Sequence, residues 1–380
     1  MIYLDNNATT AVAPEVLEAM KPHFLNPGNA ESRHSAGRSA RRAWDQARET
    51  AARILGAEPS EVIFTSGGTE ANNLAIFGLA GAEHSPGHAV SSPIEHPAVA
   101  EPVARLHAAG FVVDLPAVDS EGFANPFAMA STFRDDTRFA TLMLANNETG
   151  TIQPLAKLVE LAQERSIPVH TDAVQAAGRI PVNFRGLGVT TLAASAHKFH
   201  GPVGVGVLLV KTGVRLGSRL FGGGQQQGRR AGTVAVALAV GFAKALELWE
   251  SEAEGRSERW KLLRDRLESA LVEALGADRV VLNGPKDPAL RLPQTLNLGF
   301  RGVDGDSLLM GLDIEGVAVS LGSACASGST RPSPTLMAMK VPDDRLRSSV
   351  RFSLGADTSE RDIETAIPII IETLYRRLDS

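Results

Sequence analysis

One lysine of this chain follows a run of apolar residues and could therefore act as a reactive amine. Lys198 stands in Ser195–Pro202 (SAHKFHGP), directly after the apolar run Leu192–Ala194. A buried lysine loses its proton more readily than an exposed one and can form a Schiff base with a carbonyl compound. Most lysines are solvated, but the small apolar residues before this one favour a buried site. In a rival interpretation His197 and His200 bind a metal, although H-x-x-H without further ligands is a weak signal.

A glycine turn earlier in the chain could hold a phosphate group. In Thr65–Asn73 (TSGGTEANN) a predicted strand runs into a Gly-Gly turn, and a predicted helix begins near Thr69. Free backbone N–H groups and the positive end of the helix dipole attract anions at such a place. An ordinary turn between strand and helix explains the stretch equally well. Because the glycine spacing matches no nucleotide-binding loop, a phosphate here would belong to another kind of ligand. Ser195 and His197, beside the lysine, could donate hydrogen bonds to such a phosphate.

Between these two segments of the sequence, an aspartate follows a predicted strand. Asp172 lies in Pro168–Gln175 (PVHTDAVQ), just past a β-branched stretch. A carboxylate in this position is either a helix cap or a functional charge. Pyridoxal phosphate needs a carboxylate beside its pyridine nitrogen, so that the protonated ring can accept electrons. A phosphate turn, then Asp172, then Lys198, all at strand ends of one sheet, form an arrangement that this cofactor could use.

The chain has one cysteine, Cys325, in the stretch Ser320–Pro334. A lone cysteine is often a small buried apolar residue. Here its neighbours are glycine, serine, alanine and proline, which are typical of an exposed, mobile loop, at about residues 320–335. A thiol on such a tether could enter a cleft, take up a group and deliver it elsewhere. We therefore favour a functional thiol.

Two segments with arginine give weaker signals. Phe221–Thr233 (FGGGQQQGRRAGT) is rich in glycine and arginine, which is typical of an anion-binding or subunit-contact loop; the alternative is a flexible surface loop. Arg351 lies in an alternating strand pattern near the end of the chain, in SSVRFSLG. Its planar guanidinium could bind a substrate carboxylate through two hydrogen bonds. Taken alone, Arg351 is more often explained by a surface ion pair.

The elements that must position these residues alternate between strand and helix through the first two thirds of the chain. Such alternation predicts βαβ units, and therefore an α/β fold with a mostly parallel sheet between helices, which binds ligands beyond the carboxyl ends of its strands. The predicted strands are Glu61–Thr65, Ala89–Ser91, Phe111–Leu115, Phe139–Leu144, Pro168–Thr171, Thr191–Ala194 and Gly204–Val210. The predicted helices are Thr69–Ala80, Pro97–Ala109 and Leu155–Arg165.

A smaller α+β domain is predicted beyond a long helix at Val234–Leu275. It contains three predicted strands, at Gln294–Gly299, Val317–Ser320 and Ser349–Leu354, and two predicted helices, at Asp306–Glu315 and Ser359–Arg377. We expect a large domain at residues 13–255, and a small domain that combines residues 1–12 with residues 256–380.

Composition excludes several classes of protein. The chain has 380 residues, 43% of them hydrophobic and 21% charged, as in globular proteins. Its net charge of −5 offers no basic field for nucleic acid. No signal peptide is readable, and no apolar run approaches the ~20 residues that span a bilayer. One cysteine allows no intramolecular disulfide, which is consistent with a reducing compartment. We expect a cytoplasmic protein with no membrane or nucleic-acid partner.

Together these segments are recognisable. From end to end the chain resembles the cysteine desulfurases of the NifS/IscS type, fold-type-I pyridoxal-phosphate enzymes of the class V aminotransferase group. The matching blocks are Tyr3–Thr10, Thr65–Asn73, Glu95–Val99, Asn146–Gly150, His170–Gly178, Ser195–Gly204, Gly222–Thr233, Gly322–Ser329 and Val350–Gly355. Two segments, 26–34 and 225–236, depart from the wording usual in the family.

The resemblance implies a role for each matched residue. Lys198 would bind the cofactor, Asp172 would pair with its pyridine nitrogen, and Cys325 would accept the sulfur. His96 would stack on the ring and assist proton transfer, and Gln175 would contact its phenolic oxygen. The phosphate ligands would be Gly68, Thr69, Ser195 and His197, with Thr233 reaching the phosphate of the partner in a homodimer. The substrate carboxylate would be held by Asn147 and Arg351, with Asn7 nearby.

The implied reaction removes sulfur from L-cysteine, giving L-alanine and a persulfide on Cys325 for delivery to an acceptor protein, such as an iron–sulfur scaffold. The closest alternative is a selenocysteine lyase or another class V lyase or transaminase. A non-catalytic scaffold or sulfur-carrier binding module is a second alternative, against which the intact Lys198, Asp172 and Cys325 argue. A metal hydrolase is a distant third.

Overall fold

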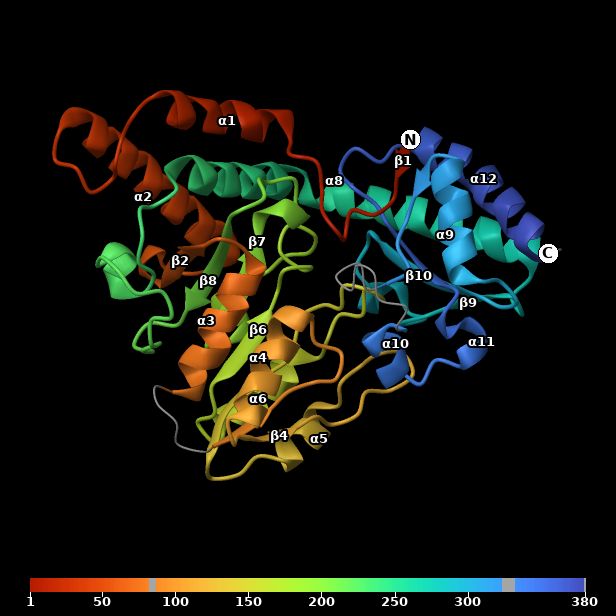
Figure 1. Ribbon diagram of the computed structural model, residues 1–380, viewed down its shortest axis with the longest axis horizontal. Helices are drawn as coiled ribbons and strands as arrows, with labels where there is room; N and C mark the ends of the chain where they lie inside the picture. Colours follow the sequence, from red (N-terminus) through yellow and green to blue (C-terminus); the bar gives the residue numbers. More distant parts are fainter. Residues whose placement is uncertain (82–86, 323–331, 379–380) are drawn as a thin grey trace.

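A seven-stranded, mostly parallel sheet forms the centre of the larger part of the molecule (Figure 1). The computed structural model describes residues 1–81, 87–322 and 332–378. In spatial order the strands are β2 (Val62–Thr65), β8 (Gly206–Val210), β7 (Thr191–Ser195), β6 (Val169–Asp172), β5 (Thr137–Thr141), β3 (His88–Val90) and β4 (Val112–Asp114). All neighbouring pairs from β7 to β4 are parallel, and only β8 runs against its two neighbours. The predicted sheet is confirmed.

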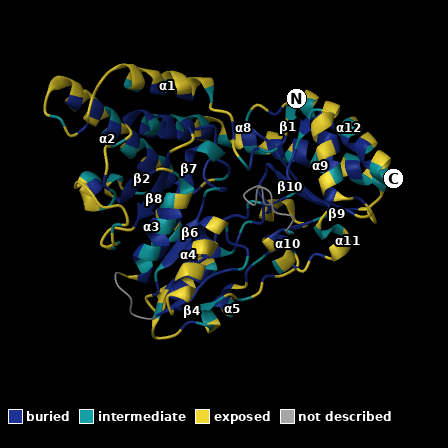
Figure 2. Cartoon of the chain, in the orientation of Figure 1, coloured by how far each residue is buried: buried dark blue, intermediate teal, exposed yellow. Residues whose placement is uncertain are grey.

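Helices cover both faces of this sheet because its strands carry apolar side chains on both sides. In β2, Ile63 packs with α3, while Phe64 contacts Trp44 of α2 and Phe242 of α8 on the other face. Most of the strands are accordingly buried, apart from the edge strand β4, and the outer helix faces are exposed (Figure 2). The helices are α1 (Pro14–Leu25), α2 (Ser35–Leu55), α3 (Gly68–Ala80), α4 (Pro97–Ala108), α5 (Pro126–Ser131), α6 (Leu155–Gln163), α7 (Phe184–Leu187) and α8 (Val236–Leu275), with the short 3-10 helices η1 (Pro59–Glu61), η2 (Ala196–Lys198) and η3 (Gln225–Gly228).

A second, smaller core lies around an antiparallel sheet of order β12-β10-β9. A short parallel pair, β1 and β11, adds the N-terminus to this region (Figure 1). Its elements are β9 (Val280–Leu282), β10 (Thr295–Phe300), β12 (Ser349–Ser353), β1 (Ile2–Tyr3), β11 (Val317–Ala318), α9 (Gly305–Ile314), α12 (Glu360–Leu378) and the 3-10 helix η4 (Pro288–Leu290). The short helices α10 (Pro334–Ala338) and α11 (Asp343–Leu346) come from the same part of the chain, but their Leu336 and Leu346 pack with the core of the large sheet.

The long helix α8 takes part in both cores. Leu246, in its first half, packs in the core of the large sheet, whereas Trp260 and Leu267 pack in the second core. The helix runs without interruption through the polar stretch at 250–259. The division at residues 12 and 255 stays a prediction.

Helices α1 and α2 were not among the predicted elements. The buried face of α2 consists largely of alanines, such as Ala40, Ala47 and Ala51, with Trp44 and Leu55 as its large residues. The alanines of the buried face and the charged residues of the outer face make α2 strongly amphipathic, so this helix could have been predicted from the sequence. In the part of the chain that the structure describes, no helix is both long and apolar enough to cross a membrane.

Candidate active site

Strand ends of the large sheet carry the central predicted residues. Asp172 is the last residue of β6, and Ser195 is the last residue of β7. Lys198 follows at once in the 3-10 turn η2. Because β6 and β7 are parallel neighbours, with Asp172 opposite Ala193, their carboxyl ends meet at one edge of the sheet. The topology therefore brings the predicted acid and the predicted lysine to the same edge.

The N-terminal segment of the chain supplies the partners of Lys198. Its Nζ donates to the carbonyl oxygens of Asn7 and Ala8, each at 2.7 Å. Gln175 Nε2 donates to the same Asn7 oxygen at 3.0 Å. Arg179 binds the backbone of the lysine, because its Nε donates to the Lys198 carbonyl oxygen at 2.9 Å. Main-chain groups that lie far away in the sequence therefore fix the amine of Lys198 beside Gln175.

Arg351 joins this group from the smaller core. Its Nη1 donates to the Asn147 carbonyl at 3.1 Å, and that oxygen also accepts from Asn7 Nδ2 at 3.2 Å. Its Nη2 pairs with Asp5 Oδ1 at 2.7 Å. The interpretation of Arg351 as a surface residue is wrong, because the side chain is only 2% exposed. It belongs to β12, which pairs with the central strand β10 of the small sheet, so its ion pair is buried.

The glycine turn places the start of α3 against the end of β7. Gly67 caps the helix with a φ of 155°, which residues with a Cβ rarely adopt. A Cβ on Gly68 would lie 2.7 Å from Val174 Cγ2 and 3.6 Å from Ser195 Cβ. The two glycines therefore permit a close approach of the helix start, with Thr69 in its first turn, to Ser195. This is the geometry in which backbone N–H groups bind an anion.

Two histidines lie close to the lysine. His197 Nδ1 is 3.1 Å from Thr9 Oγ1. Burial, followed by the positive charges of Lys198 and His96, lowers the pKa of His197 to about 4, so its ring is neutral at pH 7. His96 caps α4, where its Nδ1 accepts the backbone N–H of Ala98 at 3.0 Å. Within the described residues no group of three or more His, Cys, Asp or Glu could hold a metal ion.

The arrangement fits pyridoxal phosphate. An anion site at the start of α3, a carboxylate at the end of β6 and an amine after β7 are the three features that the cofactor requires. In addition, Gln175 Oε1 is buried with no hydrogen-bond partner within the described residues. Buried polar atoms are normally satisfied, so this oxygen is available to a ligand.

Two of the predicted site residues are not brought into this group. Thr233 is exposed in the loop before α8, and within the described chain no hydrogen bond links it to the others. Cys325 lies outside the described residues.

Several residues at the site were not predicted from the sequence. Asp5 pairs with Arg351, and Arg179 holds the backbone of the lysine. Glu148 is buried beside Arg351, where burial raises the pKa of its carboxyl, and Ser333 Oγ donates to it. Asn72, in the motif TSGGTEANN, donates to Asp172 Oδ2 at 2.6 Å. The one available signal was the position of Asn72 in α3. It lies four residues before the apolar Ile76, so this polar residue falls on the buried side of the helix.

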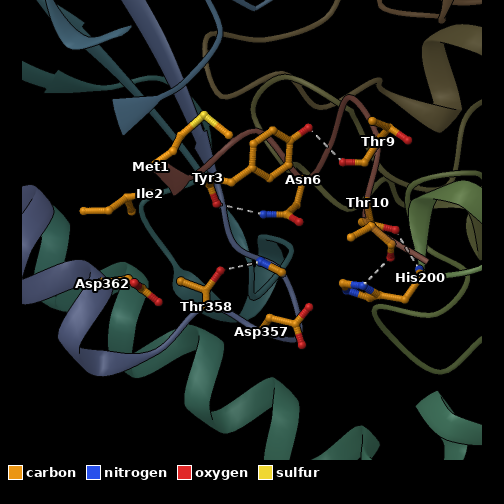
Figure 3. A pocket seen from close by; sticks show the side chains of 12 residues that line it. Met1, Ile2, Tyr3, Asn6, Thr9, Thr10, His200, Asp357, Thr358 and Asp362 are labelled. Carbon is orange, nitrogen blue, oxygen red and sulfur yellow. Dashed lines mark hydrogen bonds between the residues drawn. The ribbon is translucent and has the colours of Figure 1, made fainter. Parts of the chain in front are cut away.

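A cavity of about 470 Å³ lies apart from these residues (Figure 3). It is lined by the first residues of the chain and by Asp357, Thr358 and Asp362, and none of the predicted site residues lines it. Asn6, Thr9 and Thr10 face it, while the carbonyl oxygens of Asn7 and Ala8 contact Lys198. The segment 6–10 therefore contributes to both places.

Known proteins resemble the chain along almost its full length. Residues 2–365 match the family model described as aminotransferase class-V. A curated cysteine desulfurase IscS of Dictyoglomus turgidum is 44% identical over 97% of this chain and 93% of its own length. Among solved structures, a NifS-like protein superposes with a TM-score of 0.91 at 34% identity, covering 99% of both chains. A structure described as SspA in complex with cysteine has a TM-score of 0.81 at 32% identity, covering 94% of this chain and 99% of the other. The chain therefore belongs to the aminotransferase class-V family and, within it, to the cysteine desulfurases.

Proposed function

We propose that this protein removes sulfur from L-cysteine with the help of pyridoxal phosphate, giving L-alanine and a persulfide on Cys325. The observation that carries the proposal is the contact network that joins Lys198, Gln175, Asn7, Asn147 and Arg351 at one edge of the large sheet. A network with a base at one end and a carboxylate-binding guanidinium at the other suits an α-amino acid. The cysteine-bound relative supports the same substrate.

The chain's own residues divide the work around the cofactor. When bound, pyridoxal phosphate supplies an electron sink that makes the Cα proton of an amino acid removable. Lys198 would hold the cofactor and, once the substrate amine replaces it, take that proton. Asp172 would keep the pyridine nitrogen protonated, and Gln175 would contact the phenolic oxygen. The phosphate would be held by Gly68, Thr69, Ser195 and neutral His197. His96 would stack on the ring.

Arg351 and Asn147 would hold the substrate carboxylate, with Asn7 beside them. Two carbonyl oxygens and Asp5 already engage the terminal nitrogens of Arg351, whereas its Nε has no partner within the described residues. The guanidinium is therefore held in place before substrate arrives. A preorganised charged donor of this kind loses little entropy on binding.

The sulfur step needs the thiolate of Cys325 as nucleophile. The thiolate attacks the substrate sulfur, the carbon–sulfur bond breaks, and its electron pair stays with the three-carbon fragment. That fragment takes up protons and leaves as alanine, so a thiol and L-cysteine are converted into a persulfide and L-alanine with no external oxidant. Passing the persulfide sulfur to an acceptor protein, such as an iron–sulfur scaffold, completes the cycle.

A homodimer would complete the site. Thr233 lies in an exposed loop that also exposes the adjacent apolar residues Leu220 and Phe221, at 47% and 89%. A second copy packed on this loop would cover Phe221 and bring Thr233 toward the phosphate of the partner site. We place the protein in the cytoplasm, because the single cysteine must stay reduced to act.

The test is alanine release from L-cysteine in the presence of a thiol reductant, run in parallel on wild type and on Cys325→Ser. We expect alanine from wild type alone, while both proteins bind pyridoxal phosphate equally. The reason is that serine keeps the size of the side chain but supplies no thiolate. Alanine released equally by the variant would remove Cys325 from the reaction, and a wild-type protein that binds the cofactor without releasing alanine would contradict the proposed substrate.

Replacing Arg351 by lysine should raise KM for L-cysteine by about tenfold or more. Lysine keeps the positive charge but loses the planar fork, and hydrogen bonds to charged groups are worth about 1.5–3 kcal/mol. Steady-state kinetics would measure the effect. Arg301→Lys is the matched control, because Arg301 makes an exposed ion pair with Asp344 in the same region. An unchanged KM and kcat in Arg351→Lys would argue against the carboxylate clamp.

A further inference from the structure

A line of three buried polar side chains stands behind Asp172. Asn72 Nδ2 donates to Asp172 Oδ2 at 2.6 Å, and Asn72 Oδ1 lies 2.9 Å from His170 Nε2. His170 Nδ1 in turn lies 2.9 Å from Thr191 Oγ1. Asn72, His170 and Thr191 are all fully buried, so water does not satisfy these groups. The two contacts of His170 have the usual length of a hydrogen bond, and the contact between Asn72 and Asp172 is shorter.

The fold explains why the four residues meet. His170 and Asp172 are two apart in β6, so their side chains point to the same face of the sheet. Thr191 is the register partner of His170 on the neighbouring strand β7 and points to that face as well. Helix α3 packs on this face and carries Asn72 across it. Asparagine is a poor helix former, so its place in the buried side of α3 calls for a reason beyond helix stability.

The direction of every proton in this line follows from Asp172. An ionised carboxylate only accepts, so it must face the amide NH₂ of Asn72, which turns the amide oxygen toward His170. That oxygen also only accepts, so Nε2 of His170 carries the hydrogen. Nδ1 is then the acceptor, and the hydroxyl of Thr191 donates to it. Burial lowers the pKa of His170 to about 3, outweighing a hydrogen bond with the Thr191 backbone that raises it, so the ring is neutral at pH 7.

The second oxygen of Asp172 is fixed separately. Oδ1 accepts the backbone N–H of Val174 at 2.9 Å. Both carboxylate oxygens therefore have a protein donor, and the plane of the carboxylate is set by one donor on each side. A reversed line of protons would place the Asn72 oxygen against a carboxylate oxygen, which is repulsive.

We propose that Asn72, His170 and Thr191 are positioning residues that hold the Asp172 carboxylate oriented toward the pyridine nitrogen of the cofactor. This inference rests on the proposed function for the identity of the ligand, but not for the order of the protons. The three residues are fully buried and reach the site through Asp172. They would strengthen binding of a ring that carries a protonated nitrogen, and would be indifferent to a ring without one.

The order of the protons can be read in the cofactor-free protein by ¹⁵N NMR of labelled histidines. The chain has nine histidines, and the signal of His170 is identified by its loss in His170→Gln. We expect a neutral ring with hydrogen on Nε2 that does not titrate across neutral pH. A hydrogen on Nδ1, or a ring that titrates there, would overturn the proposal without any bearing on the enzyme's activity.

The link to the ring nitrogen is tested by titrating the cofactor-free protein with pyridoxal phosphate and with its 1-deaza analogue, which has carbon in place of that nitrogen. Asn72→Ala should weaken binding of pyridoxal phosphate by about tenfold or more and leave binding of the analogue unchanged. A general loss of structure would weaken both. Asn73→Ala is the matched control, because Asn73 is the next residue of α3 and, among the residues that the structure describes, its side chain bonds to the carbonyl oxygens of Thr69 and Ala98 and not to Asp172.

Conservative variants keep the test decisive if Asn72→Ala folds poorly. Thr191→Val removes the hydroxyl and should weaken binding of pyridoxal phosphate alone, while Thr191→Ser should restore it. Equal losses for both ligands, or no loss in either variant, would overturn the positioning role. A wild-type protein that bound neither ligand would overturn the proposed function, and with it the assignment of Asp172 as the partner of a cofactor nitrogen.

Discussion

Replacing Lys198 by alanine should abolish the formation of alanine from L-cysteine, lowering turnover by at least about a thousandfold. Among the described residues at this edge of the sheet, the amine is the group that can both hold an aldehyde and take a proton from Cα. The carbonyl oxygens of Asn7 and Ala8, which bind it, can do neither. Borohydride reduction should attach the cofactor to the wild-type protein at Lys198 and leave the variant unlabelled, as mass spectrometry of the peptides would show.

The matched control for this variant is Lys211→Ala. Lys211 is exposed and follows β8 of the same sheet, so its loss removes one charge without touching the site. Gln175 still donates to the Asn7 oxygen in Lys198→Ala, so the N-terminal segment keeps one of its contacts. Near-normal unfolding temperatures for both variants would assign the loss to chemistry. Retained turnover in Lys198→Ala would refute the assignment of the lysine.

Features that depend on local pattern could be predicted from the sequence. The strand ends at Asp172 and Ser195 follow from short β-rich runs that alternate with helical stretches, and parallel strands place such ends at one edge. The turn at Gly67 follows from glycines between a strand and a helix. The long helix near residues 234–275 follows from its length and amphipathic pattern, and it is present as α8.

Features that depend on distant contacts could not be predicted in this way. The burial of Arg351 arises because Asp5 and the Asn147 carbonyl, both far away in the sequence, satisfy its charge. An alternating strand pattern does not reveal which face an arginine takes. The partners of Lys198 are main-chain oxygens, which carry no side-chain signature at all. Only the resemblance to a family, and not the pattern, linked these residues before the structure did.

The same contacts connect the two cores. The N-terminal residues Asp5 and Asn7 lie between Lys198, which the large sheet carries, and Arg351, which the small sheet carries. Asn7 Nδ2 also donates to Thr295 Oγ1 of β10 at 2.9 Å. A shift of one core against the other would therefore change the distance between the base and the carboxylate-binding group. Their separation is set by this short segment, and we infer that the segment is part of the substrate-binding geometry.

Replacing Asp172 by asparagine should leave the fold intact but lower turnover by about a thousandfold or more and weaken binding of pyridoxal phosphate. An amide is nearly the same size as the carboxylate, but it carries no charge to keep the ring nitrogen protonated, so the electron sink fails. Its NH₂ would also face a donor, either Asn72 Nδ2 or the Val174 N–H, and an unpaired buried donor costs about 1–3 kcal/mol. Cofactor titration and alanine release measure the two effects.

The control is Asp114→Asn, at the end of β4 in the same sheet. Asp114 pairs with His88 and Arg134 at 3.0 Å, away from the lysine, so its replacement tests the loss of a strand-end carboxylate alone. Binding of the 1-deaza analogue separates the lost charge from the unpaired donor in Asp172→Asn. A ring without nitrogen does not need the charge, so only the unpaired donor affects its binding. Turnover of Asp172→Asn close to that of Asp114→Asn would mean that the charge beside the ring is supplied by another residue.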